Sequence, residues 1–169
     1  MSVETFGNFA TSSMIAEATA FKTVKAGSYV LQVNKQYEIN EDEGWARLGG
    51  RVIIDGTPRG SVFFKVQWKE ERGDNGKLKT PCRLFAQLLR SLHPKDTADE
   101  LSKIDAVTLI SEAEKYPVQA YIGEFYKVPD TSNKYGSTRK YPKTPEEVKV
   151  VLEQGGVPGN DVVSISPMR

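Results

Sequence analysis

The chain has 169 residues, 38% hydrophobic and 27% charged, which suits a single water-soluble domain with a substantial core. The net charge is only +1, but it is unevenly distributed. Residues 21–143 carry 21 Lys and Arg against 16 Asp and Glu, while the two ends together carry 2 basic and 6 acidic residues. The basic middle predicts an anionic partner. The chain has one cysteine, Cys82, and one histidine, His93, which excludes an intrachain disulfide and a zinc site of Cys and His ligands. It has no run of about 18 apolar residues, which argues against a membrane helix.

The first part of the chain predicts an arm and three strands. Residues 1–20 are rich in Ser, Thr, Ala and Gly and contain no Lys or Arg, so we expect a flexible N-terminal arm with at most a short helix near its end. Alternating apolar and polar residues then predict strands over 26–40, 45–55 and 60–71, separated by polar turns. The pair Gly49-Gly50 indicates a bulge or bend in the second strand.

The period changes to that of a helix after the third strand. The stretch TPCRLFAQLLRSLHP repeats its apolar residues at helical spacing, with Thr80 as the expected N-cap and Pro81 at the first helical position. Pro94 is expected to end this helix, and two short helices are expected over 98–104 and 108–114.

The last part of the chain predicts two strands and a helix. YPVQAYIGEFYKV has strand character, and STRKYP predicts a short final strand after a polar turn. A helix over 146–153 is expected to begin after Thr144 as cap and to stop at Gly155-Gly156. The last dozen residues are expected to form a tail.

This order predicts a mainly β fold. The order is three strands, a helix and two more strands, as in a five-stranded oligonucleotide-binding (OB) barrel, with a further C-terminal helix here. Other small sheets produce a similar order. We expect an N-terminal arm over 1–20, an OB-fold nucleic-acid-binding domain over 21–145 and a C-terminal helix and tail over 146–169. The helix should pack against the open end of the barrel, over a core made of Tyr29, Leu31, Val33, Leu48, Val52, Ile54, Val62, Phe64, Val66, Val118, Ala120 and Ile122 with Leu84, Phe85, Leu88 and Leu92.

The opposite face of the predicted sheet combines aromatic rings with positive charges. Rings can stack on the bases of a single strand, and Lys or Arg can neutralise its phosphates, and neither contact reads sequence. A basic loop after the third strand and the aromatic, basic segment 134–143 extend this surface. The candidate nucleic-acid-binding residues are therefore Trp45, Arg47, Arg51, Phe63, Lys65, Lys69, Arg72, Lys77, Lys79, Tyr121, Phe125, Lys127, Arg139 and Lys140.

Each of these residues also has a structural explanation. An outward ring can equally be covered by a helix, an arm or a second subunit, and lysines on an outer strand discourage edge-to-edge pairing. Catalytic chemistry has little support, because His93 is expected to end a helix and Cys82 to be a buried thiol. The acidic stretch 41–43 is expected to be a solvated turn rather than a cation site. We therefore expect no enzyme, no cofactor and no metal.

Several stretches together resemble the small OB-fold single-stranded DNA-binding proteins that bacteriophages encode. KAGSYVLQV is similar to the opening of their first strand, and GSVFFKVQW to the third strand after a glycine turn. The helix CRLFAQLLRSL has the expected place in the order, and VQAYIGEFYKVP with NKYGSTRKYP resembles their closing hairpin. The resemblance covers about residues 21–145. It implies a protein that coats exposed single strands during phage DNA replication, recombination or repair.

The resemblance and the composition lead to further expectations. The N-terminus lacks the pattern of a secretory signal, and a single cysteine suits a reducing compartment, so we expect a cytoplasmic location, that of the host cell for a phage protein. Many related proteins recruit replication partners through an acidic tail, but here Asp161 is the only acid among the last fifteen residues, GGVPGNDVVSISPMR. Replication or recombination proteins remain candidate partners. The sequence leaves open DNA or RNA preference and a monomer or homodimer.

Two other functions remain open from the sequence. The chain could be a phage structural or interaction protein with a β-barrel core, whose outer rings are buried in an oligomer and which has no nucleic-acid role. A third hypothesis is a nuclease or recombination accessory factor. Salt-sensitive binding of oligo-dT distinguishes the first function from the second.

Overall fold

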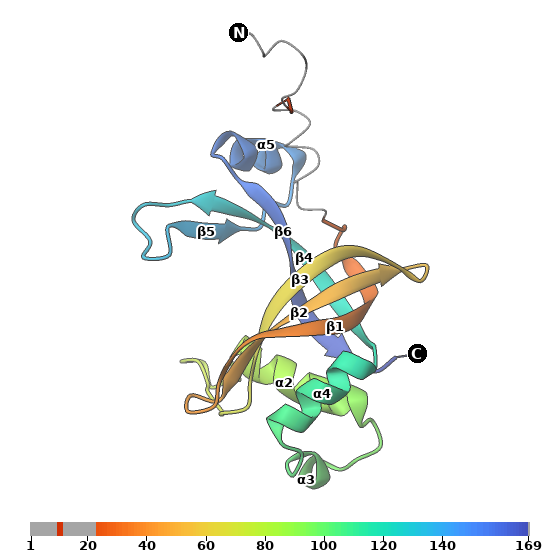
Figure 1. The fold of residues 1–169 in the computed structure, drawn as a ribbon. Coiled ribbons are helices and arrows are strands. Elements are labelled where there is room, and N and C mark those ends of the chain that lie inside the picture. Colours follow the sequence, from red (N-terminus) through yellow and green to blue (C-terminus); the bar gives the residue numbers. More distant parts are fainter. Residues whose placement is uncertain (1–9, 12–22, 169) are drawn as a thin grey trace.

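A computed structural model describes residues 10–11 and 23–168, which form six strands and four helices (Figure 1). The predicted N-terminal arm therefore lies almost wholly outside the described residues. The fold is mainly β, as predicted, and its strands pair in one antiparallel sheet. The sheet contains six strands rather than the five that the sequence predicts.

The first three strands form a meander. They are β1 (Gly27–Asn40), β2 (Trp45–Ile54) and β3 (Thr57–Gln67), and β2 pairs with both neighbours. The β2–β3 turn is the dipeptide Asp55-Gly56, and both residues adopt left-handed φ angles, of 51° and 76°. Two such residues make the tight hairpin turn that suits the twist of the flanking strands.

The remaining strands are arranged around β4 (Val118–Pro129). β6 (Val157–Ser166) lies along one edge of β4, while β1 and β5 (Ser137–Lys140) share the other edge. The outer strands β3 and β6 lie near each other, but no backbone ladder joins them within the described part of the chain. Backbone pairing thus leaves the sheet open, and the predicted closed barrel is not confirmed.

The strand β6 occupies a segment that the sequence analysis expected to be a tail, so that expectation is wrong for residues 157–166. A bulge at Val163 explains why its pattern was overlooked, since Tyr121 pairs with Ser164 and the next residue, Ile122, with Val162. The extra residue brings Val162 and Ile165 to the core although they are three positions apart. Strict alternation, the usual sequence signal of a strand, is therefore lost.

The helix α2 (Thr80–Leu92) follows β3, as predicted. Its N-cap is Lys79 without a side-chain hydrogen bond, so Thr80 is the first helical residue and the predicted N-cap is wrong by one position. The helix buries one face against the sheet, in keeping with its apolar spacing. His93 is its C-cap, as expected.

Three shorter helices complete the fold. α3 (Ala98–Leu101) and α4 (Ala106–Lys115) agree closely with the two short helices expected in this region. α5 (Pro145–Glu153) begins after Thr144, whose hydroxyl accepts a hydrogen bond from the Glu147 N–H at 3.2 Å, so the predicted cap is confirmed. Figure 1 shows α2, α3 and α4 gathered at one end of the sheet, with β5 and α5 at the other.

The predicted core is confirmed. Ten of the twelve predicted strand residues are buried in one cluster with Leu84, Phe85 and Leu88 of α2, and Tyr29, Ile54 and Leu92 pack against it half-buried. None of the helices in the described ranges is long and apolar enough to cross a membrane. Because these residues fill the inner face, the outer face of the sheet carries the polar and aromatic side chains considered next.

Candidate nucleic-acid interface

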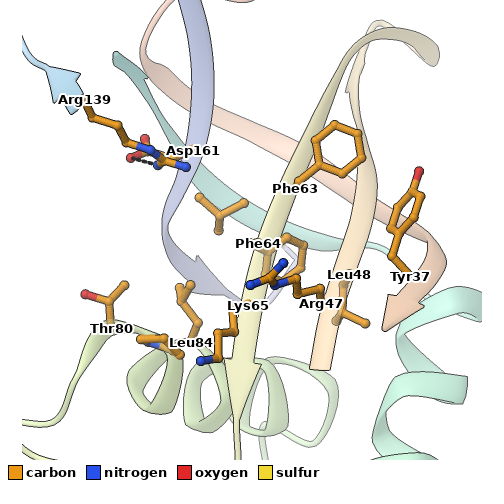
Figure 2. A pocket seen from close by; sticks show the side chains of 12 residues that line it. Tyr37, Arg47, Leu48, Phe63, Phe64, Lys65, Thr80, Leu84, Arg139 and Asp161 are labelled. Atoms are coloured by element: carbon orange, nitrogen blue, oxygen red, sulfur yellow. Dashed lines mark ion pairs between the residues drawn. The ribbon is translucent and has the colours of Figure 1, made fainter. Parts of the chain in front are cut away.

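A groove of about 530 Å³ lies where β3 approaches β6 and the start of α2. It is lined by outward side chains of β1, β2, β3, β5 and β6, by the start of α2, and by the core residues Leu48, Phe64, Leu84 and Val162. Figure 2 shows Phe63 and Tyr37 on one side, Arg139 and Asp161 on the other, and Lys65 between them.

Trp45 forms an aromatic-cation cluster with two of the predicted residues. Arg47 and Lys65 face each other across β2 and β3, with the Arg47 Cζ 5.4 Å and the Lys65 Nζ 4.9 Å from the Trp45 ring centroid. The indole N–H donates a hydrogen bond of 2.9 Å to the Glu43 carboxylate, which fixes the ring orientation. Two cations held at one ring provide positive charge beside a flat apolar surface.

Phe63 lies on the outer face, as the alternation predicts. Its side chain is 50% exposed, whereas Phe64 is 7% exposed in the core. Phe63 is paired across the sheet with Gly49 of β2, which has no side chain of its own. Half of the Phe63 side chain thus remains open to solvent.

Tyr37 is a groove residue that the sequence analysis did not identify. Strict alternation would place it on the same face as the buried Leu31 and Val33, but it is 52% exposed and lines the groove. β1 contains bulges at Asn34 and Tyr37, which reset the alternation of its side chains. A bulge or bend was expected at Gly49-Gly50, yet β2 is regular there and the bulges lie in its partner strand.

The glycine pair nevertheless has a structural role at the groove. A Cβ atom on Gly49 would lie 2.4 Å from Cε2 of Tyr37, so only glycine leaves room for this ring over β2. Lys35 places its ammonium 4.7 Å from the Tyr37 centroid and adds a third cation to the outer face. In the sequence, a glycine pair inside a strand is the pattern that indicates close approach of another group to the backbone.

Three cations of the outer face have no carboxylate ion-pair partner among the described residues. Lys35, Arg47 and Lys65 form no ion pair with any described residue, and each lies near an aromatic ring instead. An uncompensated cation next to a ring can attract a phosphate while a neighbouring base stacks.

The basic loop after β3 differs in this respect. Arg72 forms an ion pair of 2.9 Å with Glu70, and Lys79 hydrogen-bonds to Glu71. The Lys79 hydrogen bond, followed by that of Gln67, lowers the pKa of Glu71, and the Glu71 hydrogen bond raises the pKa of Lys79. The charges of Arg72 and Lys79 in this loop are thus compensated locally, whereas Lys77 has no carboxylate partner among the described side chains.

The far side of the groove is built from β4, β5 and β6. The Arg139 Cζ lies 4.1 Å from the centroid of Phe125, and Nη1 of Arg139 lies 3.7 Å from Asp161 Oδ2. Tyr141 packs beside Phe125, with ring centroids 6.5 Å apart. Asp161 was treated in the sequence as a tail acid, and only the pairing of β6 with β4 brings it to the groove.

Besides Trp45, Phe125 and the three residues of the loop after β3, five further predicted residues do not line the groove. They are exposed along the same strands or at their ends, and the structure places them at its margin or farther away. Tyr121 is the most separate, because it faces outward on β4 between Ser28 of β1 and Ser164 of β6. The five residues are Arg51, Lys69, Tyr121, Lys127 and Lys140.

Cys82 and His93, the two groups considered for catalysis, each contact a neighbouring segment of the fold. Cys82 is buried and its thiol donates to the Lys69 carbonyl at 3.4 Å. His93 Nε2 lies 2.9 Å from the Glu112 carboxylate, which connects the end of α2 to α4. Within residues 23–168, no group of three or more His, Cys, Asp or Glu side chains is arranged to hold a metal ion.

Comparisons with protein-family models, with curated proteins and with solved structures find no match to the chain. The function therefore has to be inferred from the groove itself, together with the resemblance of the sequence motifs.

Proposed function

We propose that this protein binds single-stranded DNA without reading its sequence. The observation that carries the proposal is the outer face of β1–β3, where Tyr37, Trp45 and Phe63 alternate with cations that lack carboxylate partners. The role that follows is to protect or organise exposed strands during phage DNA replication, recombination or repair, in the host cytoplasm.

The chemistry of this surface favours a single strand over a duplex. Unpaired bases can turn their flat faces to a protein ring, and each stacked base contributes about 1–3 kcal/mol. Bases inside a duplex are already stacked on one another, so the rings would be left without a partner. Ring stacking and phosphate neutralisation do not depend on the identity of the base, which supports tolerance of sequence.

We also propose that the sheet is an OB-type barrel. Three features support this: β1 pairs with both β2 and β4, a helical segment that begins with α2 lies between β3 and β4 in the chain, and β6 approaches β3. In OB folds, the face of the second and third strands and the adjacent loops bind oligonucleotides. The groove occupies the corresponding place on β2 and β3.

A second candidate function is an interaction protein with a β core. Exposed apolar side chains on α5 and at the start of β6 favour it, namely Val150, Leu152 and Val157, which are each more than half exposed. These residues lie away from the groove, so a protein partner there is compatible with DNA binding at the groove.

The test is the affinity of the purified protein for a labelled oligo-dT, measured by fluorescence anisotropy over a series of salt concentrations. We expect binding that weakens steeply as salt is added, because bound phosphates release counterions. A duplex of the same length should bind more weakly at each salt concentration. Equal binding of duplex and single strand, or no binding at low salt, would contradict the proposal.

A further inference from the structure

The position of Arg139 over Phe125 raises a question about which of the two contacts a base. Phe125 is a predicted stacking residue, but it is half-buried. The Arg139 guanidinium lies over one face, with Cζ 4.1 Å from the centroid, and Tyr141 packs at 6.5 Å. The Gly159 backbone lies so close that a Cβ there would be 2.6 Å from the Phe125 Cζ. The ring therefore has little free surface for a base.

Arg139 has the opposite properties. Its side chain is 54% exposed and lines the groove, while the ring of Phe125 supports the guanidinium from beneath. Asp161 lies at one edge, with Oδ2 3.7 Å from Nη1 of Arg139 and 3.4 Å from the Tyr141 hydroxyl. Figure 2 shows this pair extending over the groove from β5 and β6. The guanidinium is thus a flat group held in place with an exposed surface.

The charge of Arg139 is less available than its flat surface. Asp161 partly compensates the guanidinium charge, whereas Arg47 and Lys65 have no carboxylate partner among the described residues. A phosphate at Arg139 would also approach the Asp161 carboxylate and be repelled by it. Nucleobases stack on guanidinium planes as well as on aromatic rings, and an uncharged base, unlike a phosphate, is not repelled by the Asp161 charge.

We propose that Arg139 is a base-stacking platform rather than a phosphate ligand, with Phe125 and Asp161 as the positioning residues that hold its plane. The ligand of this subsite is one nucleobase of the bound single strand. The inference rests on the proposed single-strand binding and adds a stacking position on the far side of the groove from Phe63.

Two substitutions separate the plane from the charge. Arg139→Lys keeps the charge but removes the flat group, and Arg139→Tyr keeps a flat group but removes the charge. Both variants and the wild type are titrated with labelled oligo-dT over a series of salt concentrations. The Arg139 side chain is largely exposed on a short strand, so both variants should remain folded, which circular dichroism and thermal melting verify.

A platform predicts that Arg139→Lys weakens binding by roughly fivefold or more at every salt concentration, in line with the loss of a stacked base. Arg139→Tyr should bind within about twofold of the wild type, and neither variant should change the salt slope, since no phosphate contact is lost. The inference would be overturned if Arg139→Lys bound normally while Arg139→Tyr bound more weakly, with a salt slope flatter by about 0.7. That outcome would assign Arg139 to a phosphate. Equal losses in both variants, or none in either, would also overturn it.

Failure of the inference is distinct from failure of the proposed function. A wild-type protein that does not bind oligo-dT refutes single-strand binding altogether. A wild-type protein that binds, with Arg139→Lys unaffected, refutes only the platform. Lys103→Ala serves as a control for general loss of positive charge, because Lys103 is exposed near α3 and does not line the groove.

Discussion

The ring of Tyr37 lies 5.4 Å from the ring of Phe63, edge to face at an interplanar angle of 65°, although the two residues belong to β1 and β3. Gly49 of the intervening strand is opposite Phe63 and leaves the space that the Tyr37 ring fills. The pair forms a two-ring aromatic surface on the groove, and such pairs contribute about 0.5–1.5 kcal/mol beyond the area that they bury.

Phe63→Ala should separate binding from stability. Loss of one stacked base predicts an affinity for oligo-dT weaker by about 1–3 kcal/mol. The half-exposed ring leaves no closed cavity, so the free energy of unfolding should fall only by about 0.5–1.5 kcal/mol, through the lost contact with Tyr37. Anisotropy titrations and thermal melting measure the two effects.

The neighbouring residue provides the matched control. Phe64→Ala removes a ring from the core and should cost about 3–5 kcal/mol of unfolding free energy, through lost burial and a cavity. If Phe63→Ala instead lowers the melting temperature and leaves the affinity of the folded protein unchanged, the ring is structural and the stacking role must be abandoned.

Gly49→Ala should perturb the groove without disturbing the core. The added methyl group would lie 2.4 Å from Tyr37 Cε2, and the exposed ring can swing away from β2. We expect weaker binding of oligo-dT with little change in melting temperature. Gly50→Ala is the control, because its methyl group would meet the core residue Leu31 at 2.8 Å and should cost about 1–3 kcal/mol of stability through overpacking. Unchanged affinity in a folded Gly49→Ala protein would exclude Tyr37 from the binding surface.

Lys65→Ala and Lys79→Ala should differ in their salt dependence. Lys65 has no carboxylate partner in the described structure, whereas Lys79 is hydrogen-bonded to Glu71. Removing Lys65 should weaken single-strand binding and flatten the slope of log affinity against log salt by about 0.7, the value for one phosphate contact. Lys79→Ala should change the slope less. If Lys79→Ala instead flattened the salt slope more than Lys65→Ala, the phosphates would lie over the loop after β3.

Acid should destabilise the hairpin that carries Arg139. Hydrogen bonds from Ser132 and then Thr138 lower the pKa of Asp130 at the start of the β4–β5 turn. A carboxylate whose folded pKa is depressed contributes stability above its unfolded pKa, and this contribution is lost as the pH falls below about 4. The melting temperature should therefore fall in acid, and Asp130→Asn should show a shallower pH dependence below about pH 4. Parallel melting profiles for the two proteins would show that Asp130 does not stabilise the hairpin.

The sequence alone determined the features that depend on local periodicity. A period of two in GSVFFKVQW places Phe63 outward and Phe64 inward, because successive side chains of a strand point to opposite faces. Helical spacing and Thr144 likewise predict α2 and the start of α5, since both signals act within a few residues. The predicted core residues follow from the same patterns.

Tertiary structure alone decided the features that need a partner strand. The bulges at Tyr37 in β1 and Val163 in β6 reset the side-chain alternation, and a bulge is defined only by the residues that it faces. Pairing of β6 with β4 therefore converts an apparent tail into a core strand and places Asp161 beside Arg139. Charge compensation is equally non-local, because a count of basic residues cannot show that Lys79 reaches Glu71 while Lys65 remains unpaired among the described residues.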